Sequence, residues 1–145
     1  MRGLVQRVER AEVRVDGEVV GAIGAGLCVF VGVTHDDGDA EGDRLVAKLA
    51  GLRILDDDAG VMNRSVVEVG GEVLLVSQFT LYGDTAKGRR PTWNAAAPPE
   101  QAKPLLDRVA EGLSATGLSV ATGRVGEYMA VELVNDGPAT LMVEV

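Results

Sequence analysis

Short apolar runs separated by glycine-rich turns dominate the chain, and most have the period-two or continuous apolar character of β-strands. The alternation of valine with charged residues over positions 5–8 and 13–15 predicts two early strands with one wet face. Asp16–Gly17 predicts a tight hairpin after them. The continuous apolar runs at positions 27–33 and 73–76 predict strands that are buried on both faces.

Two segments have the apolar spacing of helices. Asp39 is a suitable N-cap, and apolar residues follow at helical spacing to about Leu55. A second helix is predicted between Pro98 and Gly117, where leucine and valine recur every third or fourth position. Short irregular or strand segments are expected at 61–65 and 66–69, and later strands at 118–122, 128–134 and 141–145, with 135–140 as an interruption.

These elements predict an α+β fold: mostly antiparallel strands curled into a barrel-like double β-sheet, with two helices packed on one side. A chain of 145 residues, 46% apolar and 25% charged, predicts a single globular domain over residues 1–145. No apolar run approaches the roughly 20 residues of a membrane span, and no signal-peptide pattern is present. A cytoplasmic protein without a membrane partner is therefore expected.

Charge and metal-binding chemistry narrow the possible functions. The net charge of −8 would repel nucleic acid from the chain as a whole, so any contact with nucleic acid must be local. One cysteine and one histidine argue against a protein-built metal site, and neither a metal nor a cofactor is expected. The local candidate for phosphate binding and base stacking consists of Lys87, Arg89, Arg90 and Trp93. The alternative is a solvated loop whose Trp93 indole packs on the core.

The polar residues that follow the buried run at 73–76 are the first candidate site. Ser77, Gln78 and Thr80 offer two hydroxyls and a carboxamide where a rigid strand end can hold them toward a ligand. The structural alternative is that these side chains satisfy backbone groups at the strand terminus. The residues alone favour neither interpretation.

A proline between two strand-like runs is the second candidate. Because proline cannot donate to a sheet ladder, Gly137–Pro138 should cap a strand or lie at a turn. If the bond between them is cis, the glycine relieves crowding and two carbonyl oxygens could point the same way. A trans turn is the alternative, and the sequence does not decide between them.

Together the two motifs resemble the D-aminoacyl-tRNA deacylase family. Ala139 departs from the family pattern, which usually has a larger aliphatic residue there, and this could loosen local packing. The likeness runs nearly end to end and includes Arg2, Gln6–Arg7–Val8, Met62–Asn63, Ser77–Gln78–Phe79–Thr80–Leu81, Lys87–Gly88–Arg89–Arg90–Pro91, Ala96–Ala97–Pro98–Pro99–Glu100 and Asn135–Asp136–Gly137–Pro138–Ala139–Thr140.

The resemblance implies an editing hydrolase that cleaves the ester bond of D-aminoacyl-tRNA, and of mischarged glycyl-tRNA. It implies a homodimer in which Gly137–Pro138 of one subunit reaches the other subunit's strand end and rejects L-amino acids by a fixed backbone clash. Arg7 and Met129 are implied to position that step. Arg7 could hold it by hydrogen bonding, and the alternative is that Arg7 is an exposed charge on a sheet face. The residues implied to hold and cleave the aminoacylated tRNA 3′ end are Ser77, Gln78, Phe79 and Thr80.

For the chemistry, no Ser–His–Asp arrangement can be placed in the sequence. This favours a route in which the 2′-hydroxyl of the tRNA assists water, while the backbone around Phe79 and Thr80 polarises the ester carbonyl. A Thr80 nucleophile is the alternative. Two other functions stay open: a general small-ester hydrolase, and a non-catalytic dimeric module that binds tRNA ends through its Lys87–Trp93 segment.

Overall fold

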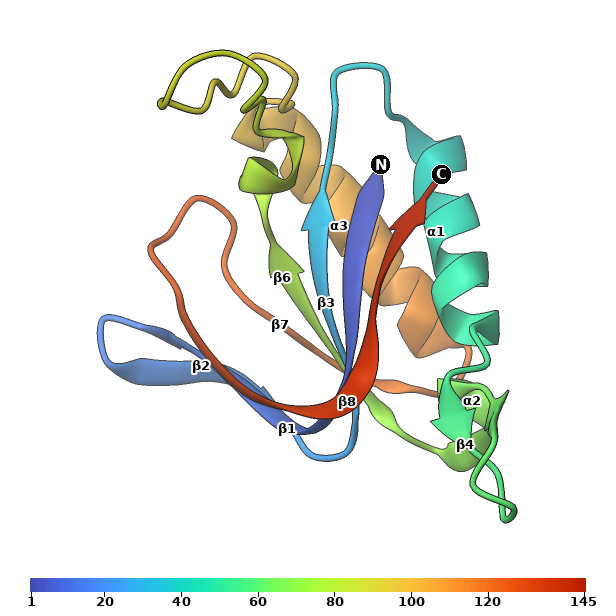
Figure 1. Ribbon diagram of the computed structural model, residues 1–145. Coiled ribbons are helices and arrows are strands. Elements are labelled where there is room, and N and C mark those ends of the chain that lie inside the picture. The colour runs from blue at the N-terminus through green and yellow to red at the C-terminus, as the bar shows by residue number, and fades with distance from the viewer.

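Strand β1 (Arg2–Val15) is the centre of the fold in the computed structural model, which describes residues 1–145. Strand β8 (Ala130–Glu144) pairs with it antiparallel along one side. On the other side, β3 (Gly26–Gly32) pairs with the first half of β1 and β2 (Glu18–Ile23) with the second half, both antiparallel. β1 is therefore paired on both sides along most of its length (Figure 1).

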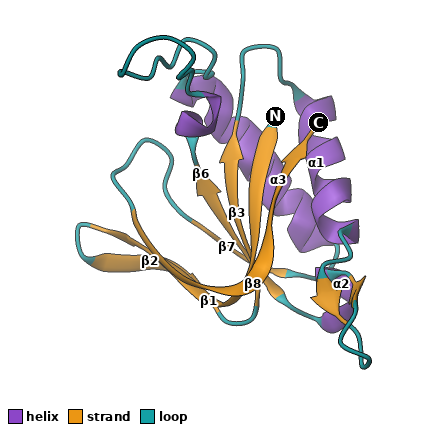
Figure 2. Ribbon diagram, viewed as in Figure 1, coloured by secondary structure: helices purple, strands orange, loops and turns teal.

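The sheet continues beyond β3 with two parallel strands, β6 (Glu72–Ser77) and β7 (Ser119–Thr122). Its opposite edges approach each other, because a Cβ added at Gly21 of β2 would lie only 2.7 Å from the Thr122 carbonyl oxygen of β7. The six-stranded mixed sheet is thus curled into a nearly closed barrel (Figure 2). The predicted barrel-like α+β fold is confirmed.

Two helices cover one face of the sheet, as predicted: α1 (Asp39–Gly51) and α3 (Pro99–Ala115) (Figure 2). None of the helices has the length and apolar character needed to cross a membrane. Between helices and sheet lies a core that includes Val5, Leu27, Val29, Leu45, Leu49, Val73, Leu105, Val109 and Leu113.

A second apolar cluster fills the inside of the curled sheet and contains Cys28, the single cysteine. Cys28 is fully buried, and this burial raises the pKa of its thiol to about 12. A thiol with that pKa is almost entirely protonated at neutral pH and is a poor nucleophile. Cys28 is therefore a core residue, in agreement with its place in an apolar run.

Two expected strand breaks are wrong. β1 is one strand, because the change in its alternation at Arg7 and Val8 marks a bend rather than an end. β8 also runs unbroken through residues 135–140. There Gln6 pairs with Thr140 and Val8 pairs with Asn135. The chain therefore advances five residues along β8 while the partner strand β1 advances only two. This wide bulge accommodates a proline that cannot donate a ladder hydrogen bond.

The prediction at residues 66–69 is also wrong, because they form the short helix α2 (Val66–Val69). The Ser65 hydroxyl accepts from the Glu68 amide at 3.2 Å, and the Glu68 carboxylate accepts from the Ser65 amide at 2.6 Å. The second bond lowers the pKa of Glu68. This reciprocal cap offsets the weak helix propensity of the valines.

The stretch after α1 likewise differs from the prediction, because the helix ends at Gly51 instead of near Leu55. The chain then forms a small separate hairpin from β4 (Leu55–Asp56) and β5 (Met62–Arg64). This hairpin brings the Ile54 carbonyl and the Asp56 carboxylate beside the middle of β1.

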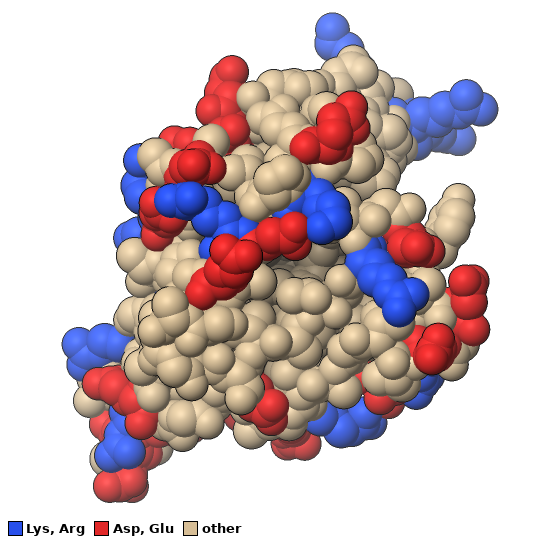
Figure 3. Space-filling view, turned by 180° about the vertical axis from the view of Figure 1, so that it is seen from behind, with Lys and Arg blue, Asp and Glu red and all other residues tan.

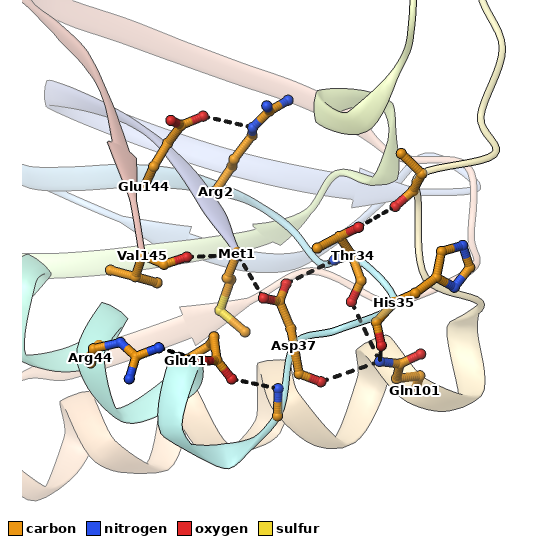
Figure 4. Close-up of polar contacts among 12 residues, drawn as sticks. Met1, Arg2, Thr34, His35, Asp37, Glu41, Arg44, Gln101, Glu144 and Val145 are labelled. Carbon is orange, nitrogen blue, oxygen red and sulfur yellow. Dashed lines mark hydrogen bonds and ion pairs between the residues drawn. The ribbon is translucent and has the colours of Figure 1, made fainter.

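A polar network joins the outer ends of β1 and β8 to the loop that precedes α1 (Figure 4). The α-amino group of Met1 is buried, forms an ion pair with Asp37 at 2.8 Å and donates to the Val145 carbonyl at 3.1 Å. From α3, the Gln101 side chain donates to the His35 carbonyl at 2.8 Å. The network therefore connects the sheet, the loop and α3 at the end of the molecule where β3 and β6 also terminate.

Candidate active site

The polar strand end predicted from the sequence lies where β6 stops and the chain turns into the short 3-10 helix η1 (Phe79–Tyr82). The Gln78 amide still donates to the Val31 carbonyl of β3 at 2.8 Å, so the turn stays attached to the sheet. The Gln78 side-chain amide donates to the Thr80 hydroxyl oxygen. A Cβ at Gly32 would lie 3.0 Å from Cβ of Leu81, so this glycine lets η1 pack over the end of β3.

A cleft of about 430 Å³ opens beside this strand end, and we call it the strand-end cleft. One wall is the β6–η1 turn and the other is the loop that leads into β8. Met129 belongs to the second wall, and a Cβ at position 123 would lie 2.7 Å from its sulfur, so Gly123 lets the loop fold back. The lining residues are Val76, Ser77, Gln78, Phe79, Gly126, Glu127, Tyr128, Met129 and Val131.

The Gly137–Pro138 step lies in the bulge of β8, and its peptide bond is cis. Residues 135–138 are exposed in the single chain, whereas Ala139 is buried, so the smaller side chain at that position is still packed. Asn135 supports the bulge from within, because its side-chain amide donates to the Arg7 carbonyl at 2.9 Å and to the Ala139 carbonyl at 3.3 Å.

Arg7 anchors the same bulge from below. Its guanidinium is only 7% exposed, yet Nε donates to the Asp136 carbonyl at 3.0 Å and Nη1 to the Ile54 carbonyl at 2.8 Å. Nη1 also lies 3.2 Å from the Asp56 carboxylate. Arg7 thus holds the carbonyl immediately before Gly137, whereas Met129 lines the strand-end cleft and not the bulge.

The two motifs do not meet within one chain. Ser77 pairs with Val31, Val31 with Gly3, and Gly3 with Val143, so these four residues form one row across the sheet. Pro138 precedes Val143 by five residues on β8. Only the three steps from Val143 to Thr140 are regular, because Pro138 lies in the bulge, so strand geometry separates Pro138 from Ser77 by about 14 Å across three strand spacings and by at least about 10 Å along the strands.

The cationic segment predicted from the sequence forms an exposed loop between η1 and α3. No ion pair or hydrogen bond engages the side chains of Lys87, Arg89 or Arg90, and cations project at this end of the molecule (Figure 3). Trp93 packs edge to face on Phe79, with ring centroids 5.4 Å apart and planes at 76°. The loop is therefore attached to the strand-end cleft through an aromatic contact.

Sequence reasoning missed the loop residues that complete the strand-end cleft, Gly126, Glu127 and Tyr128. The apolar pattern predicts a strand that begins at Tyr128, but Tyr128 lies outside β8 and is 99% exposed. Only Gly126, with a φ of 81°, could have indicated a turn here. The structure places no group of three or more His, Cys, Asp or Glu side chains where they could hold a metal.

Comparison with known proteins defines the class to which this fold and site belong. Residues 4–144 match the family model described as D-Tyr-tRNA(Tyr) deacylase. A D-aminoacyl-tRNA deacylase of Kineococcus radiotolerans is 59% identical over 145 residues, which cover 99% of each chain. The chain belongs to the D-Tyr-tRNA(Tyr) deacylase family.

Solved structures agree on the fold. The c-Myc DNA Unwinding Element Binding Protein superposes with a TM-score of 0.93 at 40% identity, over 100% of this chain and 99% of that one. A probable eukaryotic D-amino acid tRNA deacylase superposes with a TM-score of 0.84 at 19% identity, over 99% and 98% of the two chains. The second likeness supports the fold alone.

The anchoring of the bulge by Arg7 can be tested with Arg7→Lys. An ammonium group cannot reach the Asp136 and Ile54 carbonyls with the geometry of the guanidinium, so we expect the free energy of unfolding to fall by about 1–3 kcal/mol. Backbone amides of residues 135–141 should exchange hydrogen faster than in the wild type, measured by mass spectrometry at the residue level. Arg10→Lys, on the same strand but exposed, should change neither quantity, and equal effects of the two substitutions would contradict the anchoring role.

Proposed function

We propose that the protein is an editing hydrolase that cleaves the ester bond between a D-amino acid and the terminal adenosine of tRNA in the cytoplasm. The observation that carries this proposal is the 59% identity, over 99% of each chain, to a D-aminoacyl-tRNA deacylase. The strand-end cleft supports it, because the Ser77 hydroxyl and the Gln78 carboxamide line the cleft beside the aromatic ring of Phe79. The products are free D-amino acid and tRNA.

Selection by handedness is assigned to the Gly137–Pro138 step. Carbonyl oxygens of a rigid backbone can accept hydrogen bonds from the substrate's α-amino group while occupying the volume that an L side chain would need. The bonds from Arg7 and Asn135 support this role, because they hold the bulge from both of its sides. Glycine has no side chain to exclude, so mischarged glycyl-tRNA is also expected to be a substrate.

We assign the protein to a homodimer with sites shared between subunits, and the separation of the two motifs supports this assignment. Residues 135–138 are exposed and lie far along the sheet from the strand-end cleft of their own chain. A second copy, related by a two-fold axis, could place its step in that cleft, and the reverse contact would then form as well. Each site would contain the step of one subunit and the cleft of the other.

The chemistry is assigned to water assisted by the tRNA 2′-hydroxyl. The Thr80 hydroxyl oxygen accepts from the Gln78 amide, which has no basic atom there to take a proton from the hydroxyl. The first amides of η1, at Phe79 and Thr80, have no carbonyl partner within that helix and are suited to polarise the ester carbonyl. The cations of the exposed loop, with Trp93, are assigned to contacts with the tRNA backbone.

The decisive experiment compares D-tyrosyl-tRNA with L-tyrosyl-tRNA as substrates. We expect release of free D-tyrosine and at least a hundredfold slower release of L-tyrosine, because a steric clash in a rigid site discriminates strongly. Binding of both without release would support a non-catalytic tRNA-binding module. Hydrolysis of simple esters that lack a ribose would support a general esterase instead.

The source of the attacking group can be tested with Thr80→Ala and with tRNA that ends in 2′-deoxyadenosine. If the 2′-hydroxyl assists water, Thr80→Ala should keep a rate within about tenfold of the wild type, while the deoxy substrate should lose at least about a hundredfold, as expected for a missing acid–base group. Single-turnover rates at saturating enzyme measure both. A Thr80 nucleophile predicts the reverse ranking.

The shared site can be tested by mixing two inactive variants. Gly137→Ala places a methyl group whose nearest neighbour is the Asn135 side chain at 3.3 Å, so it should fold but obstruct the step. Gln78→Ala removes a cleft side chain. After unfolding and refolding together, about a quarter of wild-type activity should return, because mixed dimers form half of the population and hold one intact site each. Activity that stays at the level of the separate variants would argue for sites within single subunits.

A further inference from the structure

A second cleft, of about 280 Å³, adjoins the strand-end cleft and has no role in the reaction described above. It lies between α3, the end of β7 and the residues that follow β7. Ser77 lines both clefts, so they open on two sides of one residue. We call this second cavity the α3 cleft. Its floor is apolar, and its polar lining consists of Ser77, Lys103, Asp107, Thr122 and Arg124.

The charges around the α3 cleft favour an anion. Lys103 forms an ion pair with Asp107 at 2.8 Å, so the charges of these two side chains cancel. Arg124 is exposed and takes part in no ion pair or side-chain hydrogen bond, which leaves one net positive charge at the rim. The surrounding face mixes acidic and basic side chains (Figure 3). Because the chain as a whole carries a net charge of −8 and solvent ions screen charges over short distances, Arg124 attracts an anion only close to the cleft.

The backbone beneath Arg124 is fixed. Thr122 pairs with Leu75 of β6, and the Gly123 amide donates to the Leu75 carbonyl at 2.9 Å. Leu75 is two residues before Ser77 on the same strand, so Arg124 begins at a set place beside the strand-end cleft. Arg124 has free donors and extends from a fixed backbone position, so its guanidinium is suited to bind phosphate oxygens.

We propose that Arg124 binds the phosphate on the 5′ side of the terminal adenosine of the substrate. This inference rests on the proposed function and adds a subsite to it. The acyl ester leaves the ribose at the 3′ carbon and the phosphate at the 5′ carbon, so the two groups diverge from one sugar. The two clefts diverge from Ser77 in the same way, with the ester in the strand-end cleft and the phosphate at the α3 cleft.

The test uses two small substrates that differ in this phosphate and in the cytidine attached to it: the 3′-D-tyrosyl ester of adenosine and that of the dinucleotide cytidylyl-adenosine. The wild type should cleave the dinucleotide ester with kcat/KM about tenfold higher, as expected for one charge-assisted contact. Arg124→Gln should remove this preference by raising KM for the dinucleotide ester. Its kinetics on the adenosine ester should stay unchanged, because that ester has no phosphate.

Asp107→Asn tests the same subsite with the opposite sign. Removing this carboxylate frees Lys103 and removes a repulsive charge, so KM for the dinucleotide ester should fall by about two- to threefold. Arg108→Gln is the matched control, because Arg108 lies on the same helix but its guanidinium binds Asp43 and Asp39 of α1. It should leave the ratio between the two substrates unaltered.

The outcomes separate this inference from the proposed function. No release of D-tyrosine from D-tyrosyl-tRNA by the wild type would overturn the proposed function. Release from D-tyrosyl-tRNA, with the same dinucleotide preference in the wild type and in Arg124→Gln, or with no preference in either, would overturn the phosphate subsite alone. A loss of activity on both small esters in Arg124→Gln would also overturn it, because the residue would then act on the cleft as a whole.

Discussion

The hydrogen bonds of Arg7 connect three parts of the chain that are distant in sequence: the middle of β1, the bulge of β8 and the hairpin after α1. A buried guanidinium is costly unless its donors find partners, and here two carbonyls and the carboxylates of Asp56 and Asp136 provide them. The same bonds satisfy the Asp136 and Ile54 carbonyls, which the irregular backbone would otherwise leave without partners. The bulge can therefore depart from regular pairing while its position on the sheet stays defined.

The strand-end cleft depends on close packing at two glycines. Gly32 lets η1 lie over the end of β3, and Gly123 lets the loop before β8 fold against Met129. A larger side chain at either position would separate the two walls. Because β6 is paired on both sides, with β3 and with β7, the polar residues at its end have little freedom to move.

The sequence predicted the elements better than their boundaries. Continuous apolar runs identified β3 and β6, and the Asp16–Gly17 turn identified the β1–β2 hairpin, because these signals are local. The continuity of β8 through its proline could not be predicted, since the partners that hold the bulge are Arg7 and the residues before β4. Helix α2 was missed although its serine and glutamate cap is visible in the sequence, because the valines suggested a strand.

The candidate site was predictable only as two separate motifs. Nothing local indicated that Ser77 and Pro138 lie at different ends of the sheet, or that residues 126–128 form a cleft wall, because strand order and loop folding set both. The family resemblance implied that Arg7 positions the Gly137–Pro138 step, but the alternation of the strand alone showed it as one charged residue among several. Its burial depends on hydrogen-bond acceptors that lie more than 40 residues away in the sequence, and no periodic pattern indicates where they are.

The net charge of −8 has a consequence for an enzyme that must sample many tRNAs. Correctly charged tRNAs outnumber faulty ones in a growing cell, and a broadly basic protein would spend its time bound to them. Weak general attraction lets such molecules leave quickly, so each encounter is decided by fit at the acylated terminus. Scarcity of positive charge would thus favour rapid inspection over tight capture.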